Sequence, residues 1–316
     1  MSKLPAIQYA PRDGSGLPDH IASNRDQIDR ELLEAGAVLF RGFQVDTPEA
    51  FHDAVKAYSS QLLDYTYRST PRKEESKQVY TSTDYPASED IPMHNENSYS
   101  HSWPLKLWFY CVQPAKSGGA TPVADSRRVL ERLDRSLRER FAQRGVLYVR
   151  HYSKVMDLPW QEVFQTTDKA EVERFCRDNG IEFEWEDDNL TTRQVSQAIA
   201  RHPSTGEEVW FNQANLFHPS SLPAEDYEDM LTIFGPDKLP RNALYGDGTP
   251  FTPEELAAIR EAYEQEAVDV AWEKGDVLLI ENMLAAHGRR PFTPPRKVLV
   301  AMSEAFNLVP AHAGMS

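Results

Sequence analysis

The sequence contains few cysteines, no long apolar run and few positive charges. Cys111 and Cys176 are its two cysteines, and their separation fits neither a metal motif nor a disulfide framework, so we expect reduced, buried thiols. No stretch of about 18 uncharged apolar residues is present, and residues 1–16 lack the apolar core of a signal peptide. We therefore expect a cytoplasmic protein with no membrane partner.

The charge balance is acidic, with 34 lysines and arginines against 49 aspartates and glutamates and a formal net charge of −15. Such a chain repels a phosphate backbone, so we expect no nucleic-acid partner. The residues are 40% hydrophobic and 10% aromatic, which suffices for a large core. We expect residues 1–316 to form one domain. No heptad or apolar stripe indicates an oligomeric state, which stays open.

Periodicity and capping signals divide the chain into groups of helices and strands. Apolar spacing predicts helices at 24–35, 125–144, 168–179, 191–200 and 224–234, and two more that begin at Thr47 and Thr252. Apolar or alternating runs predict strands at 37–40, 145–152, 276–280 and 297–302 and within 94–113. Because strands bracket the helices without regular alternation, the pattern favours an α+β fold. Its core would be a distorted double-stranded β-helix, a cupin-like jelly roll, with a helical insertion around residues 154–266.

The candidate chemistry begins with His94-Asn95-Glu96. On an extended strand, residues two apart point to the same side, so both side chains can reach one metal ion. This composition yields about one such step by chance, so the step alone proves nothing. His287 follows the apolar run 277–280, and we expect it just past the end of a strand. Two histidines and one carboxylate leave open positions on iron(II), whereas zinc sites are usually tetrahedral.

Two further residues can bind a carboxylate. Arg296 precedes an apolar strand, and its guanidinium can grip a carboxylate through two hydrogen bonds. Lys297 would face the opposite side of that strand. Thr121 follows Gly118-Gly119-Ala120, where glycine permits a tight turn and the hydroxyl can donate a hydrogen bond. Taken singly, these residues are an ordinary charged strand end and an ordinary turn.

The ordered set of motifs resembles the TauD/TfdA family of iron(II)/2-oxoglutarate oxygenases, especially its amino-acid hydroxylases of natural-product pathways. The resemblance covers nearly the whole chain. The segments that carry it are 33–42, His94-Asn95-Glu96, 118–121, 210–213, 217–219 and 282–297. Two features depart from the family pattern: Glu96 stands where Asp is frequent, and Arg296 lies closer to the distal histidine than is usual.

The resemblance implies that His94, Glu96 and His287 bind iron(II). It also implies that 2-oxoglutarate chelates the iron, with its far carboxylate held by Arg296 and Thr121. The resemblance further implies that O2 is the second cosubstrate, that succinate and CO2 are released, and that an unactivated C–H bond is hydroxylated. Related halogenases carry a small residue in place of the carboxylate, so Glu96 favours hydroxylation.

The substrate is expected to be a small molecule, an amino acid or its derivative, either free or tethered to a carrier protein. Candidate substrate contacts are Tyr99, Asn212, Gln213, Arg289 and Arg290, and Asn282 is a candidate to orient a metal ligand. Two other functions stay open, a zinc-dependent hydrolase with the same three ligands and a non-catalytic jelly-roll binding protein. Iron-stimulated release of succinate separates the three functions.

Overall fold

The computed structural model describes residues 4–10, 14–64, 74–82, 85–153 and 158–308. Its largest sheet has seven strands, and all neighbours are antiparallel except the parallel pair β1–β2. In spatial order the strands are β1 (Ala6–Tyr9), β2 (Ala37–Arg41), β16 (Val277–Glu281), β6 (Ser102–Gln113), β19 (Lys297–Asn307), β4 (Val79–Thr81) and β3 (Glu74–Ser76).

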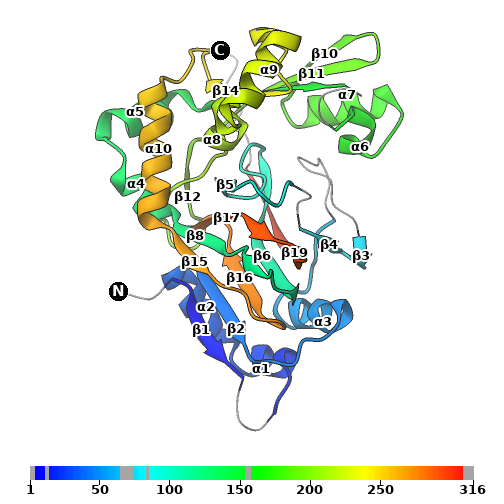
Figure 1. Cartoon of the computed structure of the whole chain (residues 1–316), viewed down its shortest axis with the longest axis vertical. Helices are drawn as coiled ribbons and strands as arrows, with labels where there is room; N and C mark the ends of the chain where they lie inside the picture. The colour runs from blue at the N-terminus through cyan, green and yellow to red at the C-terminus, as the bar shows by residue number, and fades with distance from the viewer. Residues whose placement is uncertain (1–3, 11–13, 65–73, 83–84, 154–157, 309–316) are drawn as a thin grey trace, which may run out of the picture.

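Alternate residues of the central strands face opposite sides of this sheet. Val38 and Phe40 pack with Trp108 beneath the first three helices, whereas Ala37 and Leu39 face the other side. These helices are α1 (Leu17–Ser23), α2 (Arg25–Ala35) and α3 (Pro48–Tyr58). Figure 1 shows them together at one end of the molecule.

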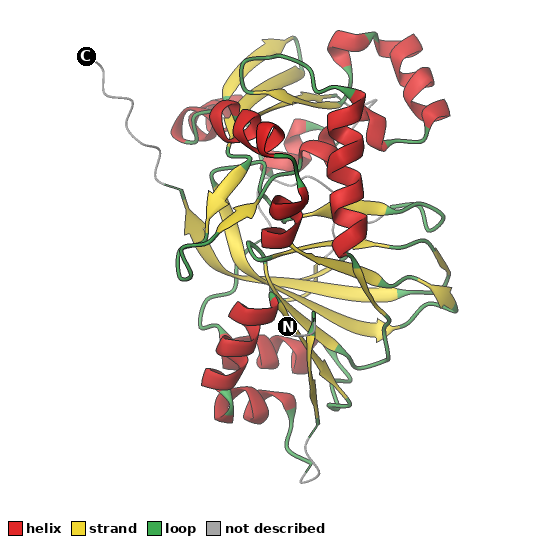
Figure 2. Ribbon diagram, turned by 90° about the vertical axis from the view of Figure 1, so that its left-hand side faces the viewer, coloured by secondary structure: helices red, strands yellow, loops and turns green. Residues whose placement is uncertain are grey.

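A four-stranded sheet covers the opposite face. Its strands, in order, are β15 (Val268–Val270), β8 (Thr121–Asp125), β17 (Ala285–Arg289) and β5 (Ile91–His94). Val123 and Ala285 from this sheet share a buried cluster with Leu107 and Leu278 of the larger sheet. The two sheets therefore enclose a common core, and Figure 2 shows their strands between two groups of helices.

A second helical layer packs on the outside of the smaller sheet through a cluster that includes Ala124, Ala286 and Phe141. It comprises α4 (Ser126–Arg132), α5 (Arg135–Arg144), α8 (Ala214–Phe217) and α10 (Pro253–Glu266). Next to it lies another four-stranded sheet, in the order β10 (Glu182–Glu186), β11 (Asn189–Ser196), β9 (Val146–Tyr152) and β14 (Arg241–Tyr245). The helices α6 (Trp160–Phe164) and α7 (Lys169–Asp178) share a separate cluster with this sheet.

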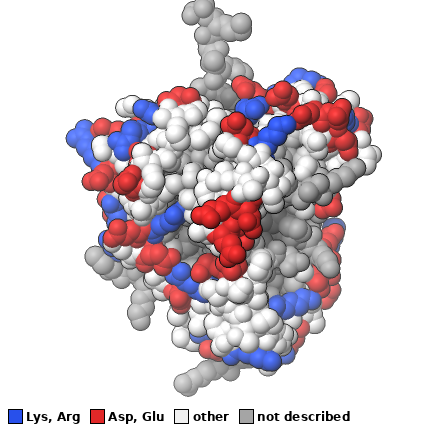
Figure 3. Space-filling model, turned by 45° about the horizontal axis from the view of Figure 1, so that its top comes forward, with Lys and Arg blue, Asp and Glu red and all other residues white. Residues whose placement is uncertain are grey.

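Short elements complete the chain. They are the strand pairs β12 (Ile199–Arg201) with β13 (Glu208–Trp210) and β7 (Ser117–Gly118) with β18 (Phe292–Thr293), the helix α9 (Ala224–Phe234), and the 3-10 turns η1 (Pro219–Ser221) and η2 (Pro236–Lys238). No helix in the described ranges is both long and apolar enough to cross a membrane. Figure 3 shows one compact group of acidic side chains near the middle of the face, with other acidic and basic side chains scattered around it.

Most predicted elements form, and their capping signals act as expected. Gly36 ends α2 with φ of 77°, and Thr47 and Thr252 cap α3 and α10. The helix predicted at 125–144 is two helices, α4 and α5.

The helix predicted at 191–200 is wrong, because that segment forms β11 and β12. Alternate residues of β11 are buried, and its β-branched residues favour a strand. The predicted insertion thus contains strands as well as helices; its residues 154–157 lie outside the described part. The single-domain assignment stays a prediction.

Candidate metal centre

Two neighbouring strands bring two histidines together. β5 and β17 pair antiparallel, and His94 and His287 are direct partners in their register, with ring centroids 4.6 Å apart. One ligand atom from each of His94, Glu96 and His287 lies within 4.8 Å of the other two. Two imidazoles and one carboxylate are the donor set of a facial metal site with open positions. The three side chains therefore fit a divalent transition metal.

The backbone around these residues differs from the prediction. β5 ends at His94, and Glu96 lies in a turn before β6, so the predicted continuous strand is wrong. Asn97 has φ of 56°, a left-handed conformation that Asn tolerates and that lets the chain reverse. His287 lies in the middle of β17, not past a strand end. A turn thus supplies the carboxylate, while paired strands supply both histidines.

Local contacts prepare the histidines as ligands. His94 Nδ1 lies 2.8 Å from the carbonyl of Pro92. A carbonyl only accepts, so Nδ1 carries the proton and Nε2 is the nitrogen available to a metal. Gly288 lets β17 approach β5, because a Cβ there would lie 2.5 Å from the carbonyl oxygen of Ile91. The close approach of the two strands depends on this glycine.

Asn282, in the connection between β16 and β17, clamps the turn that carries Glu96. Its Nδ2 donates to the carbonyls of Glu96 and Pro104, both at 2.9 Å, and its Oδ1 accepts from the Glu96 N–H at 2.7 Å. The Asn282 carbonyl in turn accepts from Asn95 Nδ2 at 2.7 Å. Asn282 and Asn95 are fully buried. Both backbone groups of Glu96 are therefore held by one side chain.

Thr121 and Arg296 line one cavity with His94 and His287. Arg296 Nε donates to the Gly119 carbonyl at 3.1 Å, and no carboxylate in the described part of the chain pairs with this guanidinium. Burial, with a contribution from neighbouring Arg289, lowers the pKa of Arg296 to about 10, so it is still a cation at neutral pH. A desolvated cation of this kind favours an anionic ligand.

The hydroxyl of Thr121 is oriented by a neighbouring indole. Trp272 Nε1 donates to Thr121 Oγ1 at 3.0 Å, so the hydroxyl proton remains available for another acceptor. Lys297, the alternative cation, pairs with Glu75 at 2.8 Å and is not among the residues that line this cavity. Arg296 and Thr121 thus both line the cavity beside the triad, whereas Lys297 does not.

The volume of a cavity does not identify the metal site. A larger cavity, of about 1080 Å³, lies beside Arg41, Arg127 and Val268. Among the described residues, however, His94, Glu96 and His287 are the one group placed to hold a metal ion. Chemistry therefore identifies the centre.

Two of the predicted substrate contacts, Gln213 and Tyr99, lie at the turn. Gln213 Nε2 donates to the Asn95 carbonyl at 2.8 Å and so supports the same turn as Asn282. Tyr99 is buried, and its hydroxyl lies 3.3 Å from Asn97 Oδ1. Asn212 instead bonds to backbone groups elsewhere: its Nδ2 donates to the Ala198 carbonyl, between β11 and β12, and its Oδ1 accepts from the Ala214 N–H in α8. Their role toward a substrate stays a prediction.

The two predicted arginine contacts have different surroundings. Arg289 lines the metal cavity, and its guanidinium donates to three backbone carbonyls in residues 85–89. Arg290 forms ion pairs with Glu264 at 2.9 Å and Asp269 at 3.0 Å and does not line that cavity. Arg289 is therefore the better placed of the two.

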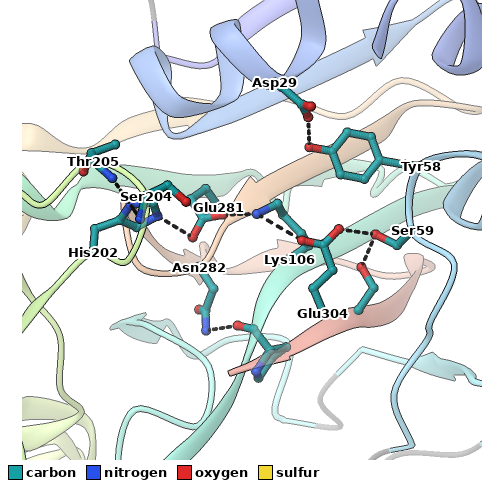
Figure 4. Close-up of polar contacts among 12 residues, drawn as sticks. Asp29, Tyr58, Ser59, Lys106, His202, Ser204, Thr205, Glu281, Asn282 and Glu304 are labelled. Atoms are coloured by element: carbon teal, nitrogen blue, oxygen red, sulfur yellow. Dashed lines mark hydrogen bonds and ion pairs between the residues drawn. The ribbon is translucent and has the colours of Figure 1, made fainter. Parts of the chain in front are cut away.

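A buried chain of charged groups, drawn in Figure 4, lies next to Asn282 and was not predicted from the sequence. Glu281 is fully buried, pairs with Lys106, and lies 3.2 Å from His202 Nε2. Lys106 also lies 3.5 Å from Glu304, which accepts from Ser59. The one signal for it was a lysine within the otherwise apolar β6.

Comparison with known proteins identifies the family. A sequence profile described as "Taurine catabolism dioxygenase TauD, TfdA family" matches residues 4–302. The chain belongs to the TauD/TfdA dioxygenase family. Membership confirms the family resemblance predicted from the motifs and the assignment of the protein as a dioxygenase, an oxidoreductase.

Two curated proteins are similar to this chain over most of their length. The dapdiamide synthesis protein DdaC of Enterobacter agglomerans is 42% identical over 276 residues, which cover 87% of this chain and 84% of DdaC. A clavaminate synthase-like protein of Arabidopsis thaliana is 34% identical over 294 residues, 89% of this chain and 86% of that protein.

Solved structures share the fold at low sequence identity. PvcB from Pseudomonas aeruginosa has a TM-score of 0.58 and 14% identity, with 97% of this chain and 90% of PvcB covered. A second PvcB structure, described as an Fe, alpha-ketoglutarate dependent oxygenase from an isonitrile synthetic pathway, has a TM-score of 0.57, 14% identity and the same coverage. The mixed helix-and-sheet architecture is therefore that of known oxygenases.

Proposed function

We propose that the protein is an iron(II)- and 2-oxoglutarate-dependent oxygenase that hydroxylates an unactivated C–H bond of a small substrate. His94, Glu96 and His287 would bind the iron, and Arg296 with Thr121 would bind 2-oxoglutarate. The observation that carries this proposal is that the triad adjoins one cavity in which a buried arginine has no carboxylate partner. An amino acid or amino-acid derivative is the proposed substrate. The names of the curated relatives, a dapdiamide synthesis protein and a clavaminate synthase-like protein, support a role in a biosynthetic pathway.

Each donor has a distinct task. The guanidinium of Arg296 presents two parallel N–H groups that match the far carboxylate of the cosubstrate. Thr121, with its oxygen occupied by the Trp272 N–H, would donate its proton to the same carboxylate. When bound, iron(II) and 2-oxoglutarate supply the oxidising chemistry from O2, with succinate and CO2 as products. The protein's own residues fix the positions of metal, cosubstrate and substrate.

We also propose that the two facing sheets are the halves of a distorted jelly roll. Their shared core and the likeness to PvcB support this assignment. In such a fold the metal lies between the sheets, where Phe109 of the larger sheet contacts His287 of the smaller one at a ring distance of 5.1 Å. Both sheets would thus form the site.

The test is anaerobic addition of iron(II) and 2-oxoglutarate to the purified protein. The expected result is a weak visible metal-to-ligand charge-transfer band. His94→Ala should abolish the band, and Arg296→Ala should weaken 2-oxoglutarate binding roughly tenfold to a hundredfold, the value of a charge-assisted double hydrogen bond. Lys297→Ala is the matched control, because this neighbouring cation pairs with Glu75 outside the cavity.

A wild-type protein that binds iron but gives no band would overturn the cosubstrate assignment. On admission of O2, release of succinate distinguishes an oxygenase from a zinc hydrolase or a binding protein that uses the same three residues.

A further inference from the structure

The guanidinium of Arg296 lines the metal cavity, yet few polar contacts hold it. Its one hydrogen bond to the described part of the chain runs from Nε to the Gly119 carbonyl, at 3.1 Å. Neither Nη group has a partner there, and neither is buried. Ordering a long side chain when a ligand arrives costs binding free energy. A tight grip on a carboxylate therefore requires another contact that orients Arg296 in advance.

An aromatic ring supplies such a contact. Arg296 Cζ lies 5.5 Å from the centre of the Phe292 ring, within the distance of about 6 Å at which a cation is attracted to an aromatic face. Phe292 is half-buried and is not among the residues that line the metal cavity. The ring therefore contacts the arginine and does not occupy the space that a ligand would fill.

The aliphatic part of Arg296 is packed against the same ring. A Cβ at position 119 would lie 3.0 Å from both Arg296 Cδ and Phe292 Cβ, so glycine is needed for this close fit. Gly119 also has φ of 72°, a left-handed conformation that glycine adopts without strain. The Gly119 carbonyl and the Phe292 ring thus hold the arginine at two points.

Phe292 is itself fixed by neighbouring segments. It lies opposite Gly118 in the β7–β18 pair, and its N–H donates to the Ala87 carbonyl at 2.8 Å. Arg289, whose guanidinium is held by backbone carbonyls of residues 85–89, has its Cζ 5.0 Å from the centre of the same ring. Two arginines that line the metal cavity therefore share one ring, and their attraction to it offsets part of their mutual repulsion.

We propose that Phe292 is a positioning residue for the cosubstrate. Its ring holds the guanidinium of Arg296 so that the unpaired N–H groups are available to the far carboxylate of 2-oxoglutarate. This inference rests on the proposed function and adds a residue that the sequence motifs do not mark. Because Phe292 acts through Arg296, its loss should affect only those 2-oxo acids that carry a far carboxylate.

The experiment is an anaerobic titration of iron(II)-loaded protein, followed by the charge-transfer band. The two ligands are 2-oxoglutarate and 2-oxopentanoate, which has the same iron-chelating group but a methyl in place of the far carboxylate. Phe292→Leu should weaken 2-oxoglutarate binding about threefold to tenfold, the value of one cation–π contact, and leave 2-oxopentanoate within about twofold. Phe292→Tyr, which keeps the ring, should bind both ligands as the wild type does.

Two further variants show whether the effect runs through Arg296. In an Arg296→Ala background, Phe292→Leu should cause no additional loss of 2-oxoglutarate binding. Phe183→Leu is the matched control, because Phe183 is also half-buried with an arginine, Arg177, 5.8 Å from its ring, but does not contact the metal cavity. It should leave both affinities unchanged.

The outcomes separate this inference from the proposed function. If Arg296→Ala weakens 2-oxoglutarate binding but Phe292→Leu does not, or weakens both ligands equally, or adds its loss to that of Arg296→Ala, the positioning role alone is wrong. A wild type without a band, or a band that Arg296→Ala leaves unchanged, overturns the proposed function and this inference with it. If Phe292→Leu does not fold, Phe292→Met, with its adaptable side chain, replaces it in every comparison.

Discussion

Replacing Asn282 by alanine tests whether a single side chain holds the carboxylate ligand in place. The substitution removes the amide that binds the N–H and the carbonyl of Glu96 and the carbonyl of Pro104. All three backbone groups lie in a buried region, so water cannot readily replace the lost partner. Each unsatisfied group costs about 1–3 kcal/mol. We expect the free energy of unfolding to fall by about 3 kcal/mol or more.

Metal binding should weaken as well, because the Glu96 backbone loses its support. Loss of a residue that orients a metal ligand typically costs about 10- to 100-fold in affinity. The assay is iron(II) binding under anaerobic conditions, with urea unfolding of the same preparations.

Asn212→Ala is the matched control. Asn212 is also a buried asparagine that bonds to two backbone groups, but these belong to Ala198 and Ala214 and not to the turn that carries Glu96. We expect it to lose about 2 kcal/mol of stability with iron affinity unchanged. If Asn282→Ala loses stability and yet binds iron as tightly as Asn212→Ala, the clamp does not position Glu96 and the reasoning fails.

Three further predictions concern packing, pH and buried charge. Gly288→Ala should push β5 away at Ile91 and lower iron affinity at least tenfold in the same binding assay. Burial lowers the pKa of His218 in the folded protein to about 4. Neutral His218 therefore contributes fully to the free energy of unfolding above about pH 6.5, and this contribution is lost as the pH falls toward 4. In urea unfolding, His218→Gln should reduce the pH dependence of that free energy over this range by about 1–2 kcal/mol. Lys106→Met should cost about 3–5 kcal/mol in urea unfolding, and adding Glu281→Gln should restore most of it.

The metal ligands were accessible from the sequence because short motifs encode them. The prediction became specific because His94, Glu96 and His287 occur in order with Thr121 and Arg296. The structure places four of these five residues around one cavity, with Glu96 beside it. The local backbone conformation could not be predicted, because the polar run after His94 fits a strand or a turn equally well. Tertiary contacts with Asn282 and others select the turn.

The middle third was the hardest part to predict. Residues 191–200 contain apolar positions that fit a helix, yet they form strands, because β11 pairs with β9 and β10 and β12 pairs with β13.

The turn with Glu96 explains why this middle third matters to the metal site. A carboxylate on a turn has none of the rigidity that paired strands give His94 and His287. Here the turn is held from three remote segments: Asn282 between β16 and β17, Gln213 before α8, and residues 196–197 at the end of β11. Two of these three lie in the segment interpreted from the sequence as an insertion. The geometry of the third metal ligand therefore depends on β11, a segment whose sequence pattern predicted a helix.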